Sequence, residues 1–475
     1  MTGEQQWLSP TIRELLSGPM QGYRLVCLVD GEHYPPVVGS TVQALEEEGG
    51  QVAALVFIGG TEKVENAAEE LGYAAPNAAI YTGAETQEEA LEQLQLALQE
   101  TRGEVVVDLS DEPVVDYADR FRLISRTLAQ RVPYVGADFI LNPPPEEKVL
   151  TKPSLSIIAT GKRVGKTAVG VSVARLLDRE GIDPVVVCMG RGGPPEPEYV
   201  NAHEMKLDAD TLIDVAREGG HAASDYWEDA LLSQVPTVGC RRCGGGMAGT
   251  PVASNVMAGA RVADQGDHHF VIMEGSGATF APVYTDRRLV IVGGAQPIDN
   301  VLHYLGEFRL STSDLAIVTM CEEPMASPEK VRQLEEGILD IKPDIDLALT
   351  VFRPEPLGSV EGKRVFLATT APQESVETIV NSLEEDHGCD VTGVSTNLSN
   401  RPKLRKELHR GLQECDVLLT EIKAASIDVA AMGAKEEGVE IIFLHNGLEL
   451  VGGNVDDLEK SILDLCQSAK GGSDD

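Results

Sequence analysis

Residues 157–170 combine an apolar run, a short loop with two glycines, and the triplet Gly165-Lys166-Thr167. A loop that opens a helix presents backbone N–H groups and the positive end of the helix dipole, which together bind phosphate. Lys166 would add a positive charge beside the β- and γ-phosphates of a nucleotide, and Thr167 would offer its hydroxyl to Mg²⁺. The spacing therefore predicts a phosphate-binding loop rather than a simple strand–helix connection.

This loop departs from the usual pattern at its first position, where Thr160 replaces glycine. Gly161 follows directly and is expected to supply the turn. Lys162 and Arg163 add two cations that a plain turn does not need, which favours anion binding. The residues expected to bind ATP are Thr160, Gly161, Lys162, Arg163, Val164, Gly165, Lys166, Thr167 and Ala168.

Glu274 ends the apolar run 271–274 and is followed by Gly275-Ser276-Gly277. Ligands of open parallel sheets bind beyond the carboxyl ends of the strands. Glu274 is therefore expected, together with Thr167, on the metal side of the nucleotide, either ligating Mg²⁺ directly or through water. The competing interpretation is a carboxylate that caps a turn.

Two arginine-containing glycine segments, 189–193 and 239–249, suggest binding of a second anion. Arg191 lies in the first, and Arg241 and Arg242 lie in the second. Guanidinium groups match phosphate or carboxylate oxygens in pairs, and glycines let the backbone approach the ligand. Cys240 and Cys243 in the second segment also suggest half a zinc site or a redox pair, but no partner motif supports either.

Two further loops after apolar runs carry titratable groups. Asp30 and His33 follow the run that begins at residue 24, and they form either a ligand site or a capped turn before Pro35. Lys423 follows the run 416–420 and would reach a phosphate, or would pair with Glu421.

The elements that must position these residues alternate between apolar strands and helical patterns, which predicts parallel sheets covered on both faces. The segment 142–148, rich in proline and charge, breaks both periodicities and predicts a linker. We expect an α/β protein with a Rossmann-like parallel-sheet domain over residues 1–145 and a P-loop NTPase domain over residues 150–345. Residues 346–475 form a C-terminal α/β segment, either a third domain or an extension of the second sheet.

Composition narrows the class of protein. The chain has 475 residues, and 76 acidic against 39 basic residues give a formal net charge of −37. The acids are dispersed, which is typical of the solvated surface of a halophilic protein and argues against a nucleic-acid partner. No apolar run approaches the roughly 18 residues of a membrane helix, so we expect a cytoplasmic protein with no membrane partner. The eight cysteines are scattered and are expected to be mostly small buried side chains.

Taken together, residues 29–36, 159–167, 189–193, 239–246 and 419–424 resemble the archaeal cyclic 2,3-diphosphoglycerate synthetases, and the resemblance spans nearly the whole chain. The central part is also similar to dethiobiotin-synthetase-like P-loop enzymes. The family implies an ATP-dependent ligase that closes 2,3-diphosphoglycerate to its cyclic phosphoanhydride and releases ADP and phosphate. It also implies Mg²⁺ and a homodimer, with K⁺ left open as a further cation.

Under this hypothesis Lys166, Lys162 and Arg163 are the catalytic cations, and Thr167 and Glu274 hold the metal. The residues expected to bind the substrate are Arg191, Arg241, Arg242, Asp30, His33 and Lys423. The alternative is a P-loop regulatory or metallochaperone-type NTPase that acts as a switch. Such proteins use a lysine early in the loop or a metal-binding tract; Lys162 is one residue from the usual place, and the chain has no His-rich tract. A nucleotide sensor without catalysis would not need so many cationic loops.

Overall fold

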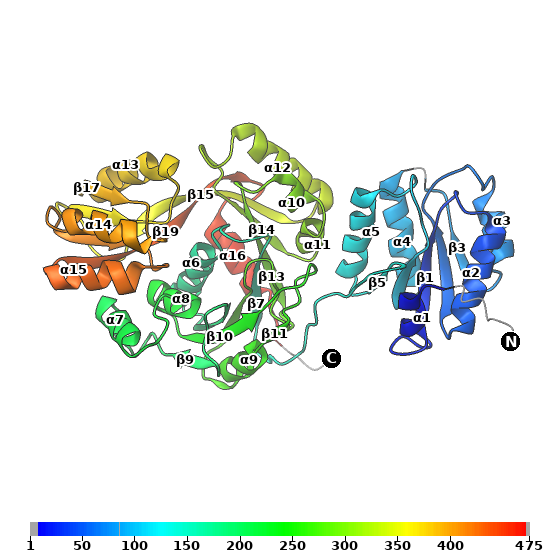
Figure 1. Cartoon of the computed structure of the whole chain (residues 1–475), viewed down its shortest axis with the longest axis horizontal. Coiled ribbons are helices and arrows are strands. Elements are labelled where there is room, and N and C mark those ends of the chain that lie inside the picture. The colour runs from blue at the N-terminus through cyan, green and yellow to red at the C-terminus, as the bar shows by residue number, and fades with distance from the viewer. Residues whose placement is uncertain (1–7, 85, 472–475) are drawn as a thin grey trace. The chain divides into compact units, whose positions relative to one another are not determined.

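The computed structural model describes residues 8–84 and 86–471, and the chain divides into two compact units. The first unit comprises Met1–Pro144 and Asp299–Thr312, and the second comprises Pro145–Ile298 and Ser313–Asp475. The return of residues 299–312 to the first unit was not expected from the sequence. Figure 1 shows the elements of each unit in chain order.

The first unit is built on a six-stranded sheet with the order β3-β2-β1-β4-β5-β6, in which only the last pair is antiparallel. Its strands are β1 (Arg24–Val29), β2 (Gln51–Phe57), β3 (Ala79–Tyr81), β4 (Val105–Asp108), β5 (Tyr134–Val135) and β6 (Ile140–Leu141). Its helices are α1 (Pro10–Leu16), α2 (Pro35–Glu47), α3 (Ala67–Ala74), α4 (Gln87–Thr101), α5 (Tyr117–Ala129) and α11 (Gly306–Ser311), and α10 (Ile298–Leu302) leads into the last of them. The order 3-2-1-4-5 is that of a Rossmann-like half, as expected.

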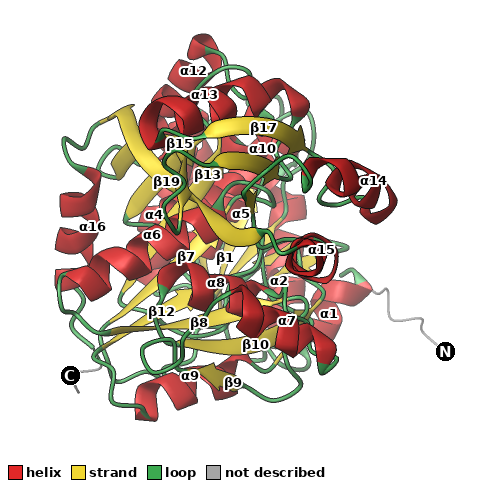
Figure 2. Ribbon diagram, turned by 90° about the vertical axis from the view of Figure 1, so that its left-hand side faces the viewer, coloured by secondary structure: helices red, strands yellow, loops and turns green. Residues whose placement is uncertain are grey.

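The second unit is built on one 13-stranded sheet. Its strands follow the order β11-β10-β8-β12-β7-β13-β14-β15-β19-β18-β16-β17, and β9 pairs with β10. Figure 2 shows β7, β12, β8 and β10 as neighbouring strands. The strands are β7 (Ser154–Ala159), β8 (Pro184–Gly190), β9 (Glu198–Val200), β10 (Thr237–Cys243), β11 (Ala253–Ser254), β12 (Phe270–Glu274), β13 (Arg287–Gly293), β14 (Leu315–Thr319), β15 (Asp346–Pro356), β16 (Arg364–Ala368), β17 (Asp390–Ser395), β18 (Val417–Thr420) and β19 (Glu440–Gly453).

Helices flank this sheet and bury their apolar faces against it. They are α6 (Lys166–Arg179), α7 (Ala209–Arg217), α8 (Asp225–Ser233), α9 (Val256–Gln265), α12 (Pro328–Ile341), the 3₁₀ turn η1 (Gln373–Ser375), α13 (Val376–His387), α14 (Arg401–Gly411), the π-helical turn η2 (Ser426–Ala431), α15 (Met432–Glu437) and α16 (Leu458–Gln467). β7, β8 and β12 are buried along their whole length, because helices cover both faces of these central strands.

The C-terminal segment extends the second sheet. β15 pairs in parallel with β14 and antiparallel with the long β19, which continues into the parallel strands β18, β16 and β17. In Figure 1 the helices α13, α14 and α15 surround this end of the sheet. The sequence did not predict β15 or the second half of β19. The division of the chain at residues 145–150 and 345–346 stays a prediction.

One local prediction was wrong. The segment that begins at Gly239 was expected to be a glycine-rich loop, but β10 occupies its first residues and ends at Cys243. Strand pairing with β8 and with β9 on the two sides of β10 outweighs the local preference of Gly239. The tight fit also needs this glycine, since a Cβ there would lie 2.5 Å from the ring of Tyr226.

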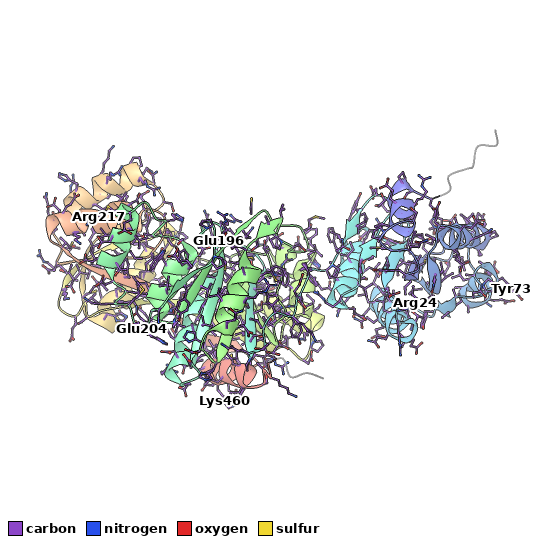
Figure 3. The ribbon with its side chains drawn as sticks, turned by 90° about the horizontal axis from the view of Figure 1, so that it is seen from below. Arg24, Tyr73, Glu196, Glu204, Arg217 and Lys460 are labelled. Carbon is purple, nitrogen blue, oxygen red and sulfur yellow. The ribbon has the colours of Figure 1, made fainter. Side chains whose placement is uncertain are left out.

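Charged side chains project from the surface of both units. Figure 3 labels several of them in the second unit, among them Glu196, Glu204 and Lys460, all of which are exposed. Within the described residues, no helix has the length and apolar character needed to cross a membrane.

Candidate active site

The predicted phosphate-binding loop connects β7 to α6. The N–H of Thr160 donates to the Ile291 carbonyl at 3.0 Å, so the backbone of Thr160 still belongs to the sheet. The chain then turns through two residues with left-handed backbone angles, Arg163 at φ 60° and Gly165 at φ 82°. Gly165 is the N-cap of α6, which places Lys166 in the first turn of the helix. The helix therefore points its positive end at the loop.

The structure explains why Thr160 is accepted where the usual pattern has glycine. The Thr160 hydroxyl donates to Gln296 Oε1 at 2.5 Å, and the same oxygen accepts from the Gly293 N–H at 3.0 Å. The turn was expected at Gly161, but the residues with left-handed backbone angles are the two later ones, Arg163 and Gly165. Gly161 is needed for space, because a Cβ there would lie 2.6 Å from Gln296 Nε2.

Lys166 and Glu274 meet at the centre of the site. The Lys166 ammonium forms an ion pair with Glu274, whose side chain is buried. Burial lowers the pKa of Lys166, but the negative charge of Glu274 outweighs this and the pKa is raised overall. Glu274 ends β12, which pairs with β7 and β8, so the sheet brings the carboxylate next to the loop as expected.

Two residues that the sequence did not single out share this buried centre. Oxygens of Asp229 and Glu274 and the Cys188 sulfur all lie within 4.8 Å of one another. Asp229 comes from α8 and Cys188 from β8. No local motif marks either residue, because only the packing of α8 against β8 and α6 brings them here.

A second group of cations lies beside the loop. The side chain of Lys162 lies against Gly277, where a Cβ would be 3.2 Å from Lys162 Cγ. The guanidinium of Arg242 is buried and donates to the Ser276 carbonyl at 2.8 Å. Burial and the positive charge of Arg191 lower the pKa of both Lys162 and Arg242. The structure thus gathers Lys162, Arg191 and Arg242 into one electropositive cluster, which Asp225 partly offsets.

The structure separates Arg241 from Arg242. Side chains alternate along β10, and the chain exposes Arg241 and Cys243 while it buries Cys240 and Arg242. Both cysteines are free. The substrate role expected of Arg241 stays a prediction.

Lys423 pairs with a residue other than the one considered from sequence. Its ammonium lies 3.8 Å from Glu228 of α8, whereas Glu421 accepts from the hydroxyls of Thr369 at 3.0 Å and Thr370 at 2.7 Å. Burial raises the pKa of Glu228 to about 7, although Lys423 opposes the shift.

Asp30 and His33 belong to the first unit. The buried carboxylate of Asp30 accepts from His33 Nδ1 at 2.8 Å and from the N–H groups of Glu32 at 3.0 Å and Asp111 at 2.6 Å. Asp30 therefore organises the loop after β1, and the substrate role expected of Asp30 and His33 stays a prediction.

Comparison with known proteins shows the family of this chain. Three family models cover the chain: the N-terminal domain of cyclic 2,3-diphosphoglycerate synthetase matches residues 24–142, its P-loop domain residues 154–351, and its C-terminal domain residues 356–447. The chain belongs to the cyclic 2,3-diphosphoglycerate synthetase family. The synthetase of Methanothermus fervidus is 45% identical over 94% of this chain and 97% of its own length.

A second relative matches the chain about as well. The synthetase of Rubrobacter xylanophilus is 47% identical over 89% of this chain and 93% of its own length. A solved structure of the hydrogenase maturation factor HypB from Archaeoglobus fulgidus is 14% identical, covers 42% of this chain and 82% of its own, and has a TM-score of 0.27. So weak a likeness says nothing about function. The relatives that match nearly the whole chain are named synthetases, so the regulatory NTPase is not favoured.

Proposed function

We propose that this chain uses ATP to close 2,3-diphosphoglycerate into its cyclic phosphoanhydride, with release of ADP and phosphate. The observation that best supports this is the cluster of Lys162, Arg191 and Arg242 beside the phosphate-binding loop, where Lys162 lies against Gly277 and Arg242 donates to the Ser276 carbonyl. The backbone N–H groups of the loop and Lys166 would suffice to bind the phosphates of ATP. In a chain of net charge −37, a further group of converging cations is suited to a second polyanion.

The proposed reaction has two steps. An oxygen of one substrate phosphate attacks the γ-phosphorus of ATP, the γ–β bond breaks, and ADP leaves. An oxygen of the neighbouring phosphate then attacks the inner phosphorus of the diphosphate just formed, the ring closes, and inorganic phosphate leaves with the electron pair of the broken bond. Both steps bring anionic groups together, so catalysis consists largely of positioning and charge stabilisation.

Each cation has a place in this scheme. Lys166, at the start of α6, would move from Glu274 to the transferred phosphoryl group. Lys162 and Arg163 lie in the loop itself and would stabilise the charge that develops between ATP and substrate. Arg191 and Arg242 would hold the two substrate phosphates close enough to react, which offsets their mutual repulsion.

Thr167 and Glu274 would offer the hydroxyl and carboxylate oxygens that Mg²⁺ prefers, so this donor set fits a divalent cation once Lys166 has left Glu274 for the phosphates. When bound, Mg²⁺ would neutralise charge on the β- and γ-phosphates.

One experiment tests the function. The purified full chain is incubated with ATP, Mg²⁺ and KCl at high concentration, with and without 2,3-diphosphoglycerate, and the products are followed by ³¹P NMR. We expect a cyclic diphosphate and ADP only when the substrate is present. ATP hydrolysis that does not depend on the substrate, without a cyclic product, would instead support the regulatory NTPase.

Lys166→Ala provides the variant for this assay, and it should abolish ADP release because the transferred phosphoryl group loses its cation. The control is Lys435→Ala, which removes a lysine that pairs with Asp210 away from the loop. Turnover by the Lys166 variant at the rate of the control would remove Lys166 from the mechanism.

A further inference from the structure

Asn255 lies at the N-terminus of α9 but does not cap that helix. Asparagine at this position usually accepts a hydrogen bond from a backbone N–H of the first helical turn. The Asn255 side chain makes no such bond. Both ends of this half-buried side chain contact segments outside α9, so the residue serves something other than the helix.

The two ends of the Asn255 amide hold two different segments. Asn255 Oδ1 accepts from the Arg241 N–H of β10 at 2.7 Å. Asn255 Nδ2 donates to the carbonyls of Pro194 at 3.2 Å and Pro195 at 3.1 Å. A side-chain amide carries both an acceptor and donors, whereas an ionised aspartate of the same size offers acceptors only. Asparagine is therefore the short side chain that can join these two segments.

The segment that Nδ2 holds crosses the carboxyl edge of the sheet. Residues 191–197, here called the strap, leave β8 after Gly190, which is the partner of Arg241 in β10. The strap then enters β9, which pairs with β10 on its other side. It passes β10 so closely that a Cβ at Gly193 would lie 2.0 Å from the Cys240 carbonyl oxygen. The contact at Gly193 and the hydrogen bonds of Asn255 therefore fix the strap to β10.

The strap begins with Arg191, which shares the electropositive cluster with Lys162 and Arg242. No described residue forms a hydrogen bond or ion pair with the exposed Arg191 side chain, so its direction depends on the backbone that carries it. Arg242, by contrast, is held by its own hydrogen bonds to the carbonyls of Gly244 and Ser276. The position of the strap therefore decides where Arg191 lies.

We propose that Asn255 is a positioning residue for the substrate, because it holds the strap against β10 and so keeps Arg191 beside Lys162 and Arg242. Without this anchor the strap would lift, and Arg191 would have to be ordered each time the substrate binds, which weakens binding. The inference rests on the proposed function insofar as that function gives Arg191 a substrate phosphate to hold.

Steady-state kinetics of the full-length chain tests this proposal. Asn255→Ala should raise the KM for 2,3-diphosphoglycerate by about threefold or more, while the KM for ATP stays within about twofold, because the strap carries no group expected to bind ATP. If Asn255 acts through Arg191, the double variant with Arg191→Ala should have a substrate KM within about twofold of that of Arg191→Ala alone. An unchanged substrate KM in Asn255→Ala, or additive increases in the double variant, would overturn the proposal.

Asn255→Asp separates the two ends of the side chain. It keeps the acceptor for the Arg241 N–H but loses the donors to the two proline carbonyls. Its substrate KM should therefore rise at least as much as that of Asn255→Ala. A KM equal to that of the unmodified chain would mean that the donors to the strap do not matter, and would overturn the proposal.

Asn454→Ala is the matched control. Asn454 accepts from the Leu347 N–H at 2.7 Å and donates to the Ile345 carbonyl at 2.9 Å, at the opposite edge of the sheet, where β15 begins. This variant should lower Tm about as much as Asn255→Ala does, because it loses the same kinds of hydrogen bond, but it should leave the substrate KM unchanged. An equal rise of the substrate KM in both variants would trace the effect to stability alone and would overturn the proposal.

Trypsin gives a second readout that needs no turnover, because it cleaves after Arg191 only when the strap can open. The fragment that ends at Arg191 should appear about threefold faster or more in Asn255→Ala than in the unmodified chain, as measured by mass spectrometry. Gly193→Ala pushes the strap from β10 at its other contact and should act in the same way, so it carries the test if Asn255→Ala does not fold. Unchanged cleavage at Arg191 in these variants would overturn the proposal. Faster cleavage in a chain that forms no cyclic diphosphate would overturn the proposed function alone.

Discussion

The Glu274 carboxylate lies directly over Gly170, on the α6 turn that follows the phosphate-binding loop. A Cβ at position 170 would lie 1.9 Å from Glu274 Oε1, which is too close for any residue other than glycine unless Glu274 moves. The glycine therefore leaves the space in which the carboxylate meets Lys166. The position of the Glu274 carboxylate therefore depends on the absence of a side chain at residue 170.

Gly170→Ala should displace Glu274 and lower kcat for cyclisation by about tenfold or more, since misplaced catalytic groups cost roughly that much. The helix itself should tolerate alanine, which is the better helix former by about 1 kcal/mol. Gly433→Ala is the matched control, because the nearest atom to its added Cβ lies 3.9 Å away. Steady-state kinetics measures kcat for both variants. A kcat of Gly170→Ala equal to that of the control would show that Glu274 does not need the space above Gly170.

Arg191 and Arg241 provide a test of the substrate-binding cluster. Arg191→Ala should raise the KM for 2,3-diphosphoglycerate by about tenfold, the loss expected for one charge-assisted contact, while the KM for ATP changes little. Arg241→Ala should have a smaller effect, because its side chain lies on the other face of β10 from Arg242. The kinetics would contradict this placement if the two variants changed the substrate KM equally.

Thr160→Gly would restore the usual first glycine of the loop. We expect it to lower the free energy of unfolding by about 1–2 kcal/mol, because the Gln296 side chain loses its donor and glycine loses more entropy on folding. Thr160→Ser keeps the hydroxyl and should remain close to the unmodified chain. Urea unfolding measures the free energy of unfolding of both variants. A Thr160→Gly variant more stable than the unmodified chain would show that the Thr160 hydroxyl does not stabilise the fold.

His445 should make stability depend on pH. Its side chain is buried, its Nε2 lies 3.2 Å from the Ser172 hydroxyl, and burial together with the charges of Arg175 and Lys423 lowers its pKa from 6.5 to about 4. The unfolded chain therefore takes up a proton between pH 6.5 and 4 that the folded chain does not, so stability is lost as the pH falls through this range.

The comparison is between the unmodified chain and His445→Gln. From pH 7 to pH 5 the unmodified chain should lose about 2 kcal/mol more unfolding free energy than the variant, at about 1.4 kcal/mol for each unit of pKa difference. Urea unfolding at the two pH values measures this difference, and the many carboxylates contribute equally to both proteins. Equal losses would mean that His445 titrates normally in the folded state.

The sequence determined most of the elements and the central chemistry of this protein. The apolar runs 271–274 and 416–420 form β12 and β18, which end at the same residues as the runs, because apolar runs flanked by glycine or charge leave few alternatives. Lys166 and Glu274 were predicted to share a site because carboxyl ends of parallel strands meet at one edge of a sheet.

The tertiary structure alone decided the contacts made across elements. Pairing between strands turned the segment after Thr237 into β10 and so separated Arg241 from Arg242. Packing of α8 brought Asp229 to Glu274, although no spacing in the chain relates them. Residue types and local spacing determine strands, loops and the residues within one motif. Contacts between distant segments depend on which faces pack together. The free energy of that packing is a sum over many segments of the fold, so no single motif predicts it.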